Sequence, residues 1–397
     1  MPILALGQLF GWGTTYYMPS VLAPHLARDL GLDATGVYLG VTIMVAIGGL
    51  ASPSAGRLLD RYGAARFMIA APITIGLGHV LVAAHPTAAT WYFAWVLHGI
   101  AMPFGLTLAV NTYLTRVTGV GARRRIGLVA LLVGFAPSAF WPATAALEAQ
   151  FGWRGTLVVY AVIEIAALLP LQMWIAARWS DAVPNFEAGR GTTRSSDPPP
   201  ATLSPTIRTI AIVAMVVAFT AQGFASWGLP LHVIRLFQDL GLDDTTAVTV
   251  AAASGAATIA ARTLEVTLGQ RLHPLTTTGF SIAILAPMLA LLGSPLDPLM
   301  AAWIFIVVWS GANGILAVLR NTLPLTLFGA EDYGRLMGRM SLPQNLVFAA
   351  SPAVFAQAMD RGGPTLALWL AIVASLTALV AAVILQRIAR PSHGRSH

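Results

Sequence analysis

Hydrophobic residues along the chain gather into long runs that short polar segments separate. A helix needs about 20 apolar residues to cross the hydrocarbon core of a bilayer, and it satisfies its own backbone hydrogen bonds where water is absent. The pattern therefore predicts twelve membrane-spanning helices. We expect them near residues 3–27, 35–56, 67–86, 91–115, 125–147, 155–177, 207–236, 245–268, 277–294, 299–326, 335–358 and 364–388.

Composition supports a membrane protein and argues against other classes. Of the 397 residues, 56% are hydrophobic and only 10% are charged, whereas soluble domains carry about 25% charged residues. The net charge of +7 is spread in short clusters between apolar runs, which argues against a nucleic-acid partner. The chain has no cysteine and shows no nucleotide loop, metal-ligand cluster or Ser–His–Asp order. We expect neither an enzyme nor a bound cofactor or metal.

Arginines are concentrated in alternate connections between the predicted spans. Such a bias places the arginine-rich connections in the cytoplasm, and the opposite connections carry mostly aspartates. We therefore expect both termini and the central connection to be cytoplasmic, as in a bacterial inner-membrane protein. The arginines are Arg57, Arg61 and Arg66, then Arg116 and Arg123 to Arg125, then Arg178, Arg190, Arg194 and Arg208, and finally Arg387, Arg390 and Arg395.

One segment, residues 178–206, is rich in Pro, Ser, Gly and charge and cannot span a membrane. Such a composition is typical of a solvated linker. The predicted organisation is a six-helix bundle at 1–177, a cytoplasmic linker loop at 178–206, a second six-helix bundle at 207–391 and a cytoplasmic tail at 392–397.

The two predicted bundles share an internal repeat. When the sequence is shifted by 210 residues, the DLGLD segment at 29–33 falls on an identical segment at 239–243. The same shift superposes Asn111 on Asn321 and Arg61 on Arg271. Parallel repeats of this kind place the substrate site at the interface of the repeats, near the bilayer midplane.

The segment from Gly56 to Arg66 reads GRLLDRYGAAR and follows the second predicted span. It resembles the signature that the major facilitator superfamily carries in this loop. The resemblance implies an all-α membrane protein with twelve transmembrane helices in two six-helix bundles, the major facilitator fold. It also implies that Asp60, Arg61 and Arg66 form a cytoplasmic latch between the bundles, where the alternative is a plain arginine-rich loop. In the second half Gln270 replaces the acidic residue, so that copy of the latch is degenerate.

The first span contains GWGTTYY at residues 11–17, followed by Pro19 and Pro24. This span is similar to the first span of bacterial carriers related to monocarboxylate porters and oxalate:formate antiporters. Those carriers hold a carboxylate with an arginine in the eighth span, which Arg262 would match. Many monocarboxylate porters have an acidic residue just before that arginine, whereas here Glu265 follows it.

Two arginines, Arg262 and Arg320, fall within predicted spans of the second half. Charged residues inside a membrane are costly and are functional candidates, and a guanidinium can bind a carboxylate through two hydrogen bonds. The alternatives are an internal pair of Arg262 with Glu265 and snorkelling of Arg320 to the interface. The first half is expected to bury almost no charge. Because the second half holds both membrane arginines, we expect it to bind the substrate.

The spans expected to line the cavity are the first, fourth, seventh and tenth, and all four contain polar and aromatic residues. Such side chains offer an apolar wall with hydrogen-bonding tips, which suits a small organic acid; helix packing is the alternative. The candidate substrate-binding residues are Arg262, Arg320, Tyr16, Tyr17, Asn111, Gln222, Trp227 and Asn313.

Proton coupling needs a titratable group in the membrane, and the candidates are His98 and Glu265. His98 titrates near neutral pH without help, although a lone histidine is often a packing residue. Glu164 is a weaker candidate, because the sixth span is expected to be peripheral.

The predicted function is secondary active transport of a small organic anion by alternating access, coupled to a proton or a counter-anion, by a monomer in the lipid bilayer. The rival is a drug or toxin exporter that works by proton antiport. Spans 1, 2, 4 and 5 lack the carboxylate that cation exporters usually carry, and span 4 has no arginine before Arg116. A transporter-like sensor is a third class, which no extra domain supports.

Overall fold

The structure is a computed structural model that describes residues 2–118, 122–178, 204–268, 273–328 and 333–389. All regular elements within these residues are helices. Most of the predicted linker, the predicted tail and the positions of Gln270 and Arg271 lie outside the described residues.

The first part of the chain forms helices that two π-helical segments interrupt. The elements are α1 (Pro2–Trp12), η1 (Gly13–Tyr17), α2 (Pro19–Leu30), α3 (Ala34–Tyr62), α4 (Ala70–Ala84), α5 (Ala88–Gly105), α6 (Thr107–Thr118), α7 (Ala122–Val133), α8 (Ala136–Val162), η3 (Ile163–Leu168) and α9 (Leu169–Arg178). Within α8 the backbone turns at Gly152, whose φ of 65° suits a residue without a side chain.

The later part of the chain forms longer helices. They are α10 (Pro205–Asp239), α11 (Asp244–Leu268), α12 (Pro274–Ala283), α13 (Leu285–Leu291), α14 (Pro298–Phe328) and α15 (Tyr333–Ala389). The long α15 turns at Gly363, where φ is 61°. Eight helical segments among the described residues are long and apolar enough to cross a membrane.

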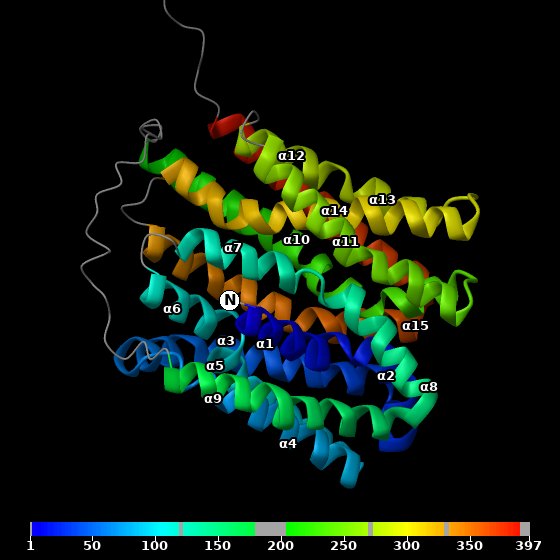
Figure 1. The fold of residues 1–397 in the computed structure, drawn as a ribbon. Helices are drawn as coiled ribbons and strands as arrows, with labels where there is room; N and C mark the ends of the chain where they lie inside the picture. The colour runs from blue at the N-terminus through cyan, green and yellow to red at the C-terminus, as the bar shows by residue number, and fades with distance from the viewer. Residues whose placement is uncertain (1, 119–121, 179–203, 269–272, 329–332, 390–397) are drawn as a thin grey trace, which may run out of the picture. The chain divides into compact units, whose positions relative to one another are not determined.

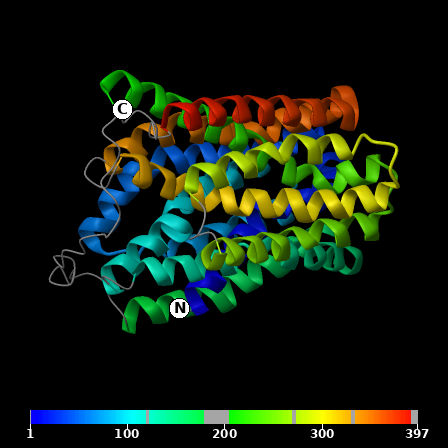
Figure 2. The same ribbon diagram turned by 90° about the horizontal axis from the view of Figure 1, so that it is seen from above.

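The chain folds into two compact units. Unit 1 comprises Met1–Thr193 with Pro352–Gln357, and unit 2 comprises Arg194–Ser351 with Ala358–His397. Within each unit the long helices run alongside one another (Figure 1), and the view from above agrees (Figure 2). This arrangement buries one side of most helices and leaves the other side outward.

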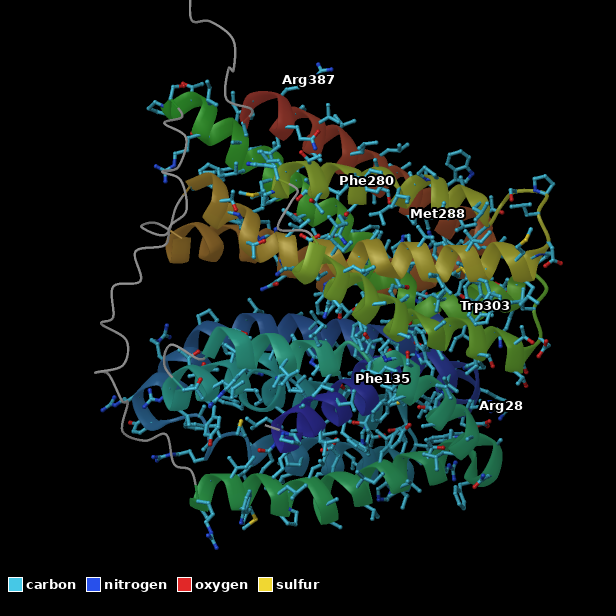
Figure 3. The ribbon with its side chains drawn as sticks, turned by 45° about the horizontal axis from the view of Figure 1, so that its top comes forward. Arg28, Phe135, Phe280, Met288, Trp303 and Arg387 are labelled. Atoms are coloured by element: carbon cyan, nitrogen blue, oxygen red, sulfur yellow. The ribbon has the colours of Figure 1, made fainter. Side chains whose placement is uncertain are left out.

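Large apolar side chains cover much of the outward surface of both units. Leu50 is 69% exposed in unit 1 and Phe280 is 72% exposed in unit 2. Figure 3 shows Phe280 on α12 and Trp303 on α14. Soluble proteins rarely expose extended apolar surface, so these outward faces fit contact with lipid.

The repeated DLGLD segments adopt the same local structure in the two units. Gly31 and Gly241 have φ of 65° and 102°. The positive φ allows the backbone to leave the preceding helix in a left-handed turn at both positions. Asp33 then accepts a hydrogen bond from the amide of Gly36 at 2.6 Å, and Asp243 accepts one from the amide of Thr246 at 3.0 Å. Each aspartate thus caps the start of the next helix.

Candidate functional site

Arg320, Phe348 and Trp227 form a stack in unit 2. The guanidinium carbon of Arg320 on α14 lies 5.2 Å from the centre of the Phe348 ring on α15, within the range of a cation–π interaction. Phe348 also stacks with Trp227 on α10, at 5.6 Å between ring centres and 8° between planes. Three helices therefore contribute to one cationic and aromatic cluster.

The Nε atom of Arg320 is buried and has no hydrogen-bond partner within the part of the chain that the structure describes. A buried donor without a partner costs free energy, and for a cation the cost is larger. Arg320 is therefore placed where a hydrogen-bond acceptor from outside the protein would be favourable.

Gly223 fixes the position of the Phe348 ring. A methyl group at Gly223 would lie 1.9 Å from Cε1 of Phe348, so the ring rests directly against the backbone of α10. The hydroxyl of Ser351 also donates a hydrogen bond to the carbonyl of Phe224. These two contacts hold α15 against α10 at the level of the cluster.

Gln222 and Asn313 join α10 to α14 beside this cluster. The Nε2 of Gln222 donates to Oδ1 of Asn313 at 2.6 Å, and Nδ2 of Asn313 donates to the carbonyl of Trp309 at 2.8 Å. Gln222 is buried and Asn313 is half-buried. Of the substrate-binding residues predicted in the second half, these two are in direct contact.

Arg262 on α11 is half-buried and contacts α14. Its Nε donates to the carbonyl of Gly314 at 3.2 Å, one residue after Asn313. The helices approach closely here, because a methyl group at Gly314 would lie 3.0 Å from the carbonyl oxygen of Thr258. The structure thus gives Arg262 a backbone partner on another helix in addition to the Glu265 pairing considered from sequence.

The predicted residues of the first half lie in unit 1. Tyr16 is buried in η1, and its ring contacts those of Trp12 at 5.8 Å and Tyr17 at 5.1 Å. Tyr17 in turn contacts Trp141 at 5.6 Å. Asn111 is half-buried on α6. The tyrosines therefore form an aromatic chain within unit 1.

Unit 1 also buries a polar group that the sequence analysis ranked low. The side chain of Glu164 is 2% exposed and those of His79 and His98 are 2% and 3% exposed. The His79 and His98 rings lie 5.2 Å apart. Glu164 is therefore a buried ionisable group in the half that was expected to bury almost no charge.

The comparison with known families settles the class of this protein. The sequence model described as "Major Facilitator Superfamily" matches residues 4–352. This chain belongs to the major facilitator superfamily. It is a multi-pass membrane transporter, as the resemblance of the 56–66 segment implied, and not an enzyme.

A solved structure has the same fold as this major facilitator protein. It is the crystal structure of a bacterial homologue of the human lysosomal transporter Spinster, in an inward-facing and occupied conformation, with a TM-score of 0.71 and 14% identity. The alignment covers 98% of this chain and 96% of that one. At this identity the likeness establishes the fold alone.

A curated relative matches part of the major facilitator chain. It is an uncharacterised 38 kDa protein in a 23S RNA operon of Thermoproteus tenax, 28% identical over 163 residues. The match covers 40% of this chain and 42% of that relative, so the chain spans less than half of its length.

The superfamily latch stays a prediction. Asp60 lies in the last turn of α3, and its side chain is outside the described part. Arg61 and Arg66 are exposed, and the guanidinium carbon of Arg61 lies 5.1 Å from the centre of the Tyr62 ring. Arg61 lies in the last turn of α3, and Arg66 lies in the connection to α4.

Phe348 and Glu164 are the residues that sequence reasoning missed or undervalued. Phe348 is an ordinary apolar residue in an apolar run, and no sequence signal distinguishes it from a lipid-facing one. Glu164 did carry a signal, because an ionisable residue within a predicted span is a functional candidate by default. Its low rank came from the expected position of the sixth span.

Proposed function

We propose that this chain is a secondary active transporter of a small organic anion, similar in chemistry to a monocarboxylate, that works by alternating access. The observation that supports this proposal most is the buried Nε of Arg320, a cationic donor without a hydrogen-bond partner among the described residues. A carboxylate bound there would supply the missing acceptor and compensate the charge.

The surroundings of Arg320 suit a small acid with an apolar body. The Phe348 ring presents a flat apolar surface next to the guanidinium, and Trp227 stacks with that ring. The amides of Gln222 and Asn313 lie on α10 and α14, the helices that carry Trp227 and Arg320. Binding sites for small molecules combine such apolar walls with a few polar groups that fix orientation. Arg262 supports this arrangement by holding α11 against α14 next to Asn313.

The remaining parts of the proposal rest on the sequence. Twelve transmembrane helices in two six-helix bundles, a bacterial inner-membrane location, cytoplasmic termini and a monomeric state complete the proposed transporter. Tyr16, Tyr17 and Asn111 are proposed as further substrate-binding residues. Asp60, Arg61 and Arg66 are proposed to form the latch that closes the cytoplasmic side.

The proposal is tested by uptake of radiolabelled lactate and formate into proteoliposomes that contain the purified protein. We expect Arg320→Gln to lower uptake about 100-fold, because hydrogen bonds to a charged group contribute about 1.5–3 kcal/mol and about 1.4 kcal/mol is a factor of ten. Arg387→Gln is the matched control, since Arg387 is an exposed arginine at the end of α15 (Figure 3). Equal uptake by Arg320→Gln and wild type would refute the anion site.

The alternative function is export of a drug or toxic compound by proton antiport. A groove of about 380 Å³ in unit 2 favours it, because its lining is almost entirely apolar and includes Val216, Phe224, Pro343 and Val347. Efflux of ethidium from cells that express the protein distinguishes the two functions. An exporter would lower ethidium accumulation in the wild type and also in the Arg320→Gln variant. An anion carrier would lower ethidium accumulation in neither.

A further inference from the structure

Two π-helical segments of unit 1 meet through their side chains. The hydroxyl of Thr14, in η1, lies 3.2 Å from Oε1 of Glu164, in η3. Both residues are buried: Thr14 is 0% and Glu164 is 2% exposed. π-Helical segments are rare and are frequent at functional sites. The contact therefore marks a second candidate centre, which belongs to unit 1.

Thr14 can complement Glu164 in either protonation state. Its Oγ1 lies 2.9 Å from the carbonyl oxygen of Phe10 as well as 3.2 Å from Glu164. A hydroxyl has one proton to donate and can also accept. When the proton points to Phe10, the hydroxyl accepts a hydrogen bond from a protonated Glu164. When the carboxyl is ionised, the hydroxyl proton turns toward it.

A small cavity connects Glu164 to further polar groups. It has a volume of about 10 Å³ and is lined by Glu164, Gln172, Gly7 and Gly11 among others. That space suits about one water molecule. The Oε1 of Gln172 is a buried acceptor that has no hydrogen-bond partner within the described ranges. The end of the Gln172 side chain packs against Gly7, since a methyl group there would lie 2.6 Å from Nε2 of Gln172.

His79 orients Thr14 from α4. Its Nε2 donates to the Thr14 carbonyl at 3.1 Å, so in the neutral ring Nδ1 carries the lone pair. The Nδ1 atom is buried and has no hydrogen-bond partner in the described part of the chain. The His98 ring lies beside His79 on α5. His79 thus holds the η1 backbone that presents the Thr14 hydroxyl to Glu164.

The titratable and charged groups on the surrounding elements are few. The buried ones are His79 on α4, His98 on α5, Tyr160 on α8 and Tyr16 on η1, and Tyr17 on η1, Tyr92 on α5 and Glu148 on α8 are half-buried. Arg154 on α8 and Arg178 on α9 lie ten and fourteen residues from Glu164, or about 15 and 21 Å along a helix. Among the described residues Glu164 therefore has no basic ion-pair partner, which leaves a proton as the cation that neutralises it.

We propose that Glu164 is the proton-binding site of this transporter, with Thr14, His79 and the water-sized cavity as its positioning environment. The proposal rests on the proposed anion transport, because the bound proton compensates the charge of the anion that moves with it. A proton passes from water in the cavity to the Glu164 carboxylate and returns to water in the other conformation. Glu164 takes this role in place of His98 and Glu265, the candidates from sequence.

Infrared difference spectroscopy of the purified wild-type protein tests the proton site without any substrate. As pH is lowered, we expect the carbonyl stretch of a buried carboxylic acid to appear. Glu164→Gln should abolish this band, because the amide keeps the shape but carries no titrating proton. Glu148→Gln is the matched control, since Glu148 is 24% exposed and pairs with His25 at 3.2 Å. Glu265→Gln tests the rival site.

A band that persists in Glu164→Gln, or that Glu265→Gln removes, would overturn the proposal. A Glu164 band that responds to sodium and not to pH would also overturn the proposal. If Glu164→Gln does not fold, Thr14→Val replaces it, because valine keeps the shape and removes the hydroxyl. The Thr14 hydroxyl binds the ionised carboxylate more strongly than the neutral acid, because hydrogen bonds to charged groups are stronger. A difference of about 1 kcal/mol corresponds to about 0.7 pH unit, so the midpoint of the band should rise by that amount in Thr14→Val. An unchanged midpoint would contradict the assignment.

Transport in proteoliposomes separates this proposal from the anion site. With lactate as the probe, Glu164→Gln should lose accumulation driven by a pH gradient and keep exchange of internal for external lactate. Wild-type lactate transport that fails altogether, with a normal infrared band, would refute the anion proposal and leave the proton site intact. Gradient-driven accumulation in Glu164→Gln would refute the proton site alone.

Discussion

The two units share sequence features, but one buries an acidic side chain and the other a cationic one. Both cap a helix with the aspartate of a DLGLD segment and both turn between their last helical stretches at a glycine with positive φ. Inside, unit 1 buries the carboxyl of Glu164 beside the Thr14 hydroxyl, whereas unit 2 places the Arg320 guanidinium over the Phe348 ring, which in turn stacks with Trp227. One unit thus buries an acid and the other a guanidinium cation, which suits the proposed proton site and the proposed anion site.

Gly223 offers the strongest way to break the unit 2 side of this comparison. Gly223→Ala forces the Phe348 ring away from α10, because the added methyl group would lie 1.9 Å from the ring, and overpacking typically costs about 1–3 kcal/mol. We expect a lower thermal unfolding midpoint and loss of lactate uptake. Gly127→Ala is the control, since nothing lies within 4 Å of a methyl group there. Equal midpoints for the two variants would show that the ring position does not depend on Gly223.

Arg262→Ala tests whether the contact between α11 and α14 in unit 2 is needed for transport. The change removes the hydrogen bond to the Gly314 carbonyl, and bonds to charged groups contribute about 1.5–3 kcal/mol. We expect lactate uptake to fall at least about tenfold while the infrared band of Glu164 keeps its pH midpoint. A variant that inserts normally and transports lactate with wild-type kinetics would remove Arg262 from the site.

The ion pair of Arg235 with Asp360 is a smaller test of unit 2. Arg235 on α10 reaches Asp360 on α15 at 2.7 Å and Asp239 at 3.8 Å, with both partners partly exposed. Partly exposed pairs contribute about 0–1 kcal/mol. Asp360→Asn should therefore lower the unfolding midpoint slightly in low salt and leave uptake unchanged. A large loss of uptake would give this end of the unit a role in transport.

The smallest expected effect is on the acid dependence of unfolding, and it involves Asp29 at the exposed end of unit 1. The hydrogen bond from Nε1 of Trp153, at 2.9 Å, lowers the pKa of Asp29, and the neighbouring Arg28 lowers it further. A carboxyl whose pKa is lower in the folded protein than in the unfolded chain, where it is about 3.9, stabilises the fold at pH values above the unfolded pKa. This stability is lost as pH falls through the folded pKa. Trp153→Phe should reduce the acid dependence of the unfolding midpoint. The exposed Trp303→Phe should leave it unchanged.

The sequence predicted the helices well because their signal is long and apolar. The span expected at 299–326 is α14, Pro298–Phe328, and the second span begins within one residue of α3, Ala34–Tyr62. The DLGLD repeat was visible in the sequence, and the structure adds that its aspartates cap helices and its glycines adopt positive φ. What the pattern could not show were the π-helical segments η1 and η3, because a helix that is apolar all round has no periodicity from which a local change of pitch can be read.

The candidate site was only partly predictable for the same reason. Arg262 and Arg320 stood out because charge is rare in an apolar run, and Gln222 and Asn313 stood out as polar residues there. Phe348 could not be found, since its role depends on the absence of a side chain at Gly223, on another helix. Glu164 was undervalued because its importance depends on Thr14, 150 residues away.

Proton movement during lactate uptake tests most directly whether unit 1 binds the proton while unit 2 binds the anion. A pH electrode outside wild-type proteoliposomes should record alkalinisation when lactate is added, because protons enter with the anion. Arg320→Gln should show neither lactate entry nor alkalinisation, and Glu164→Gln should exchange lactate without alkalinisation. Alkalinisation of wild-type size in the Glu164→Gln vesicles would contradict the account.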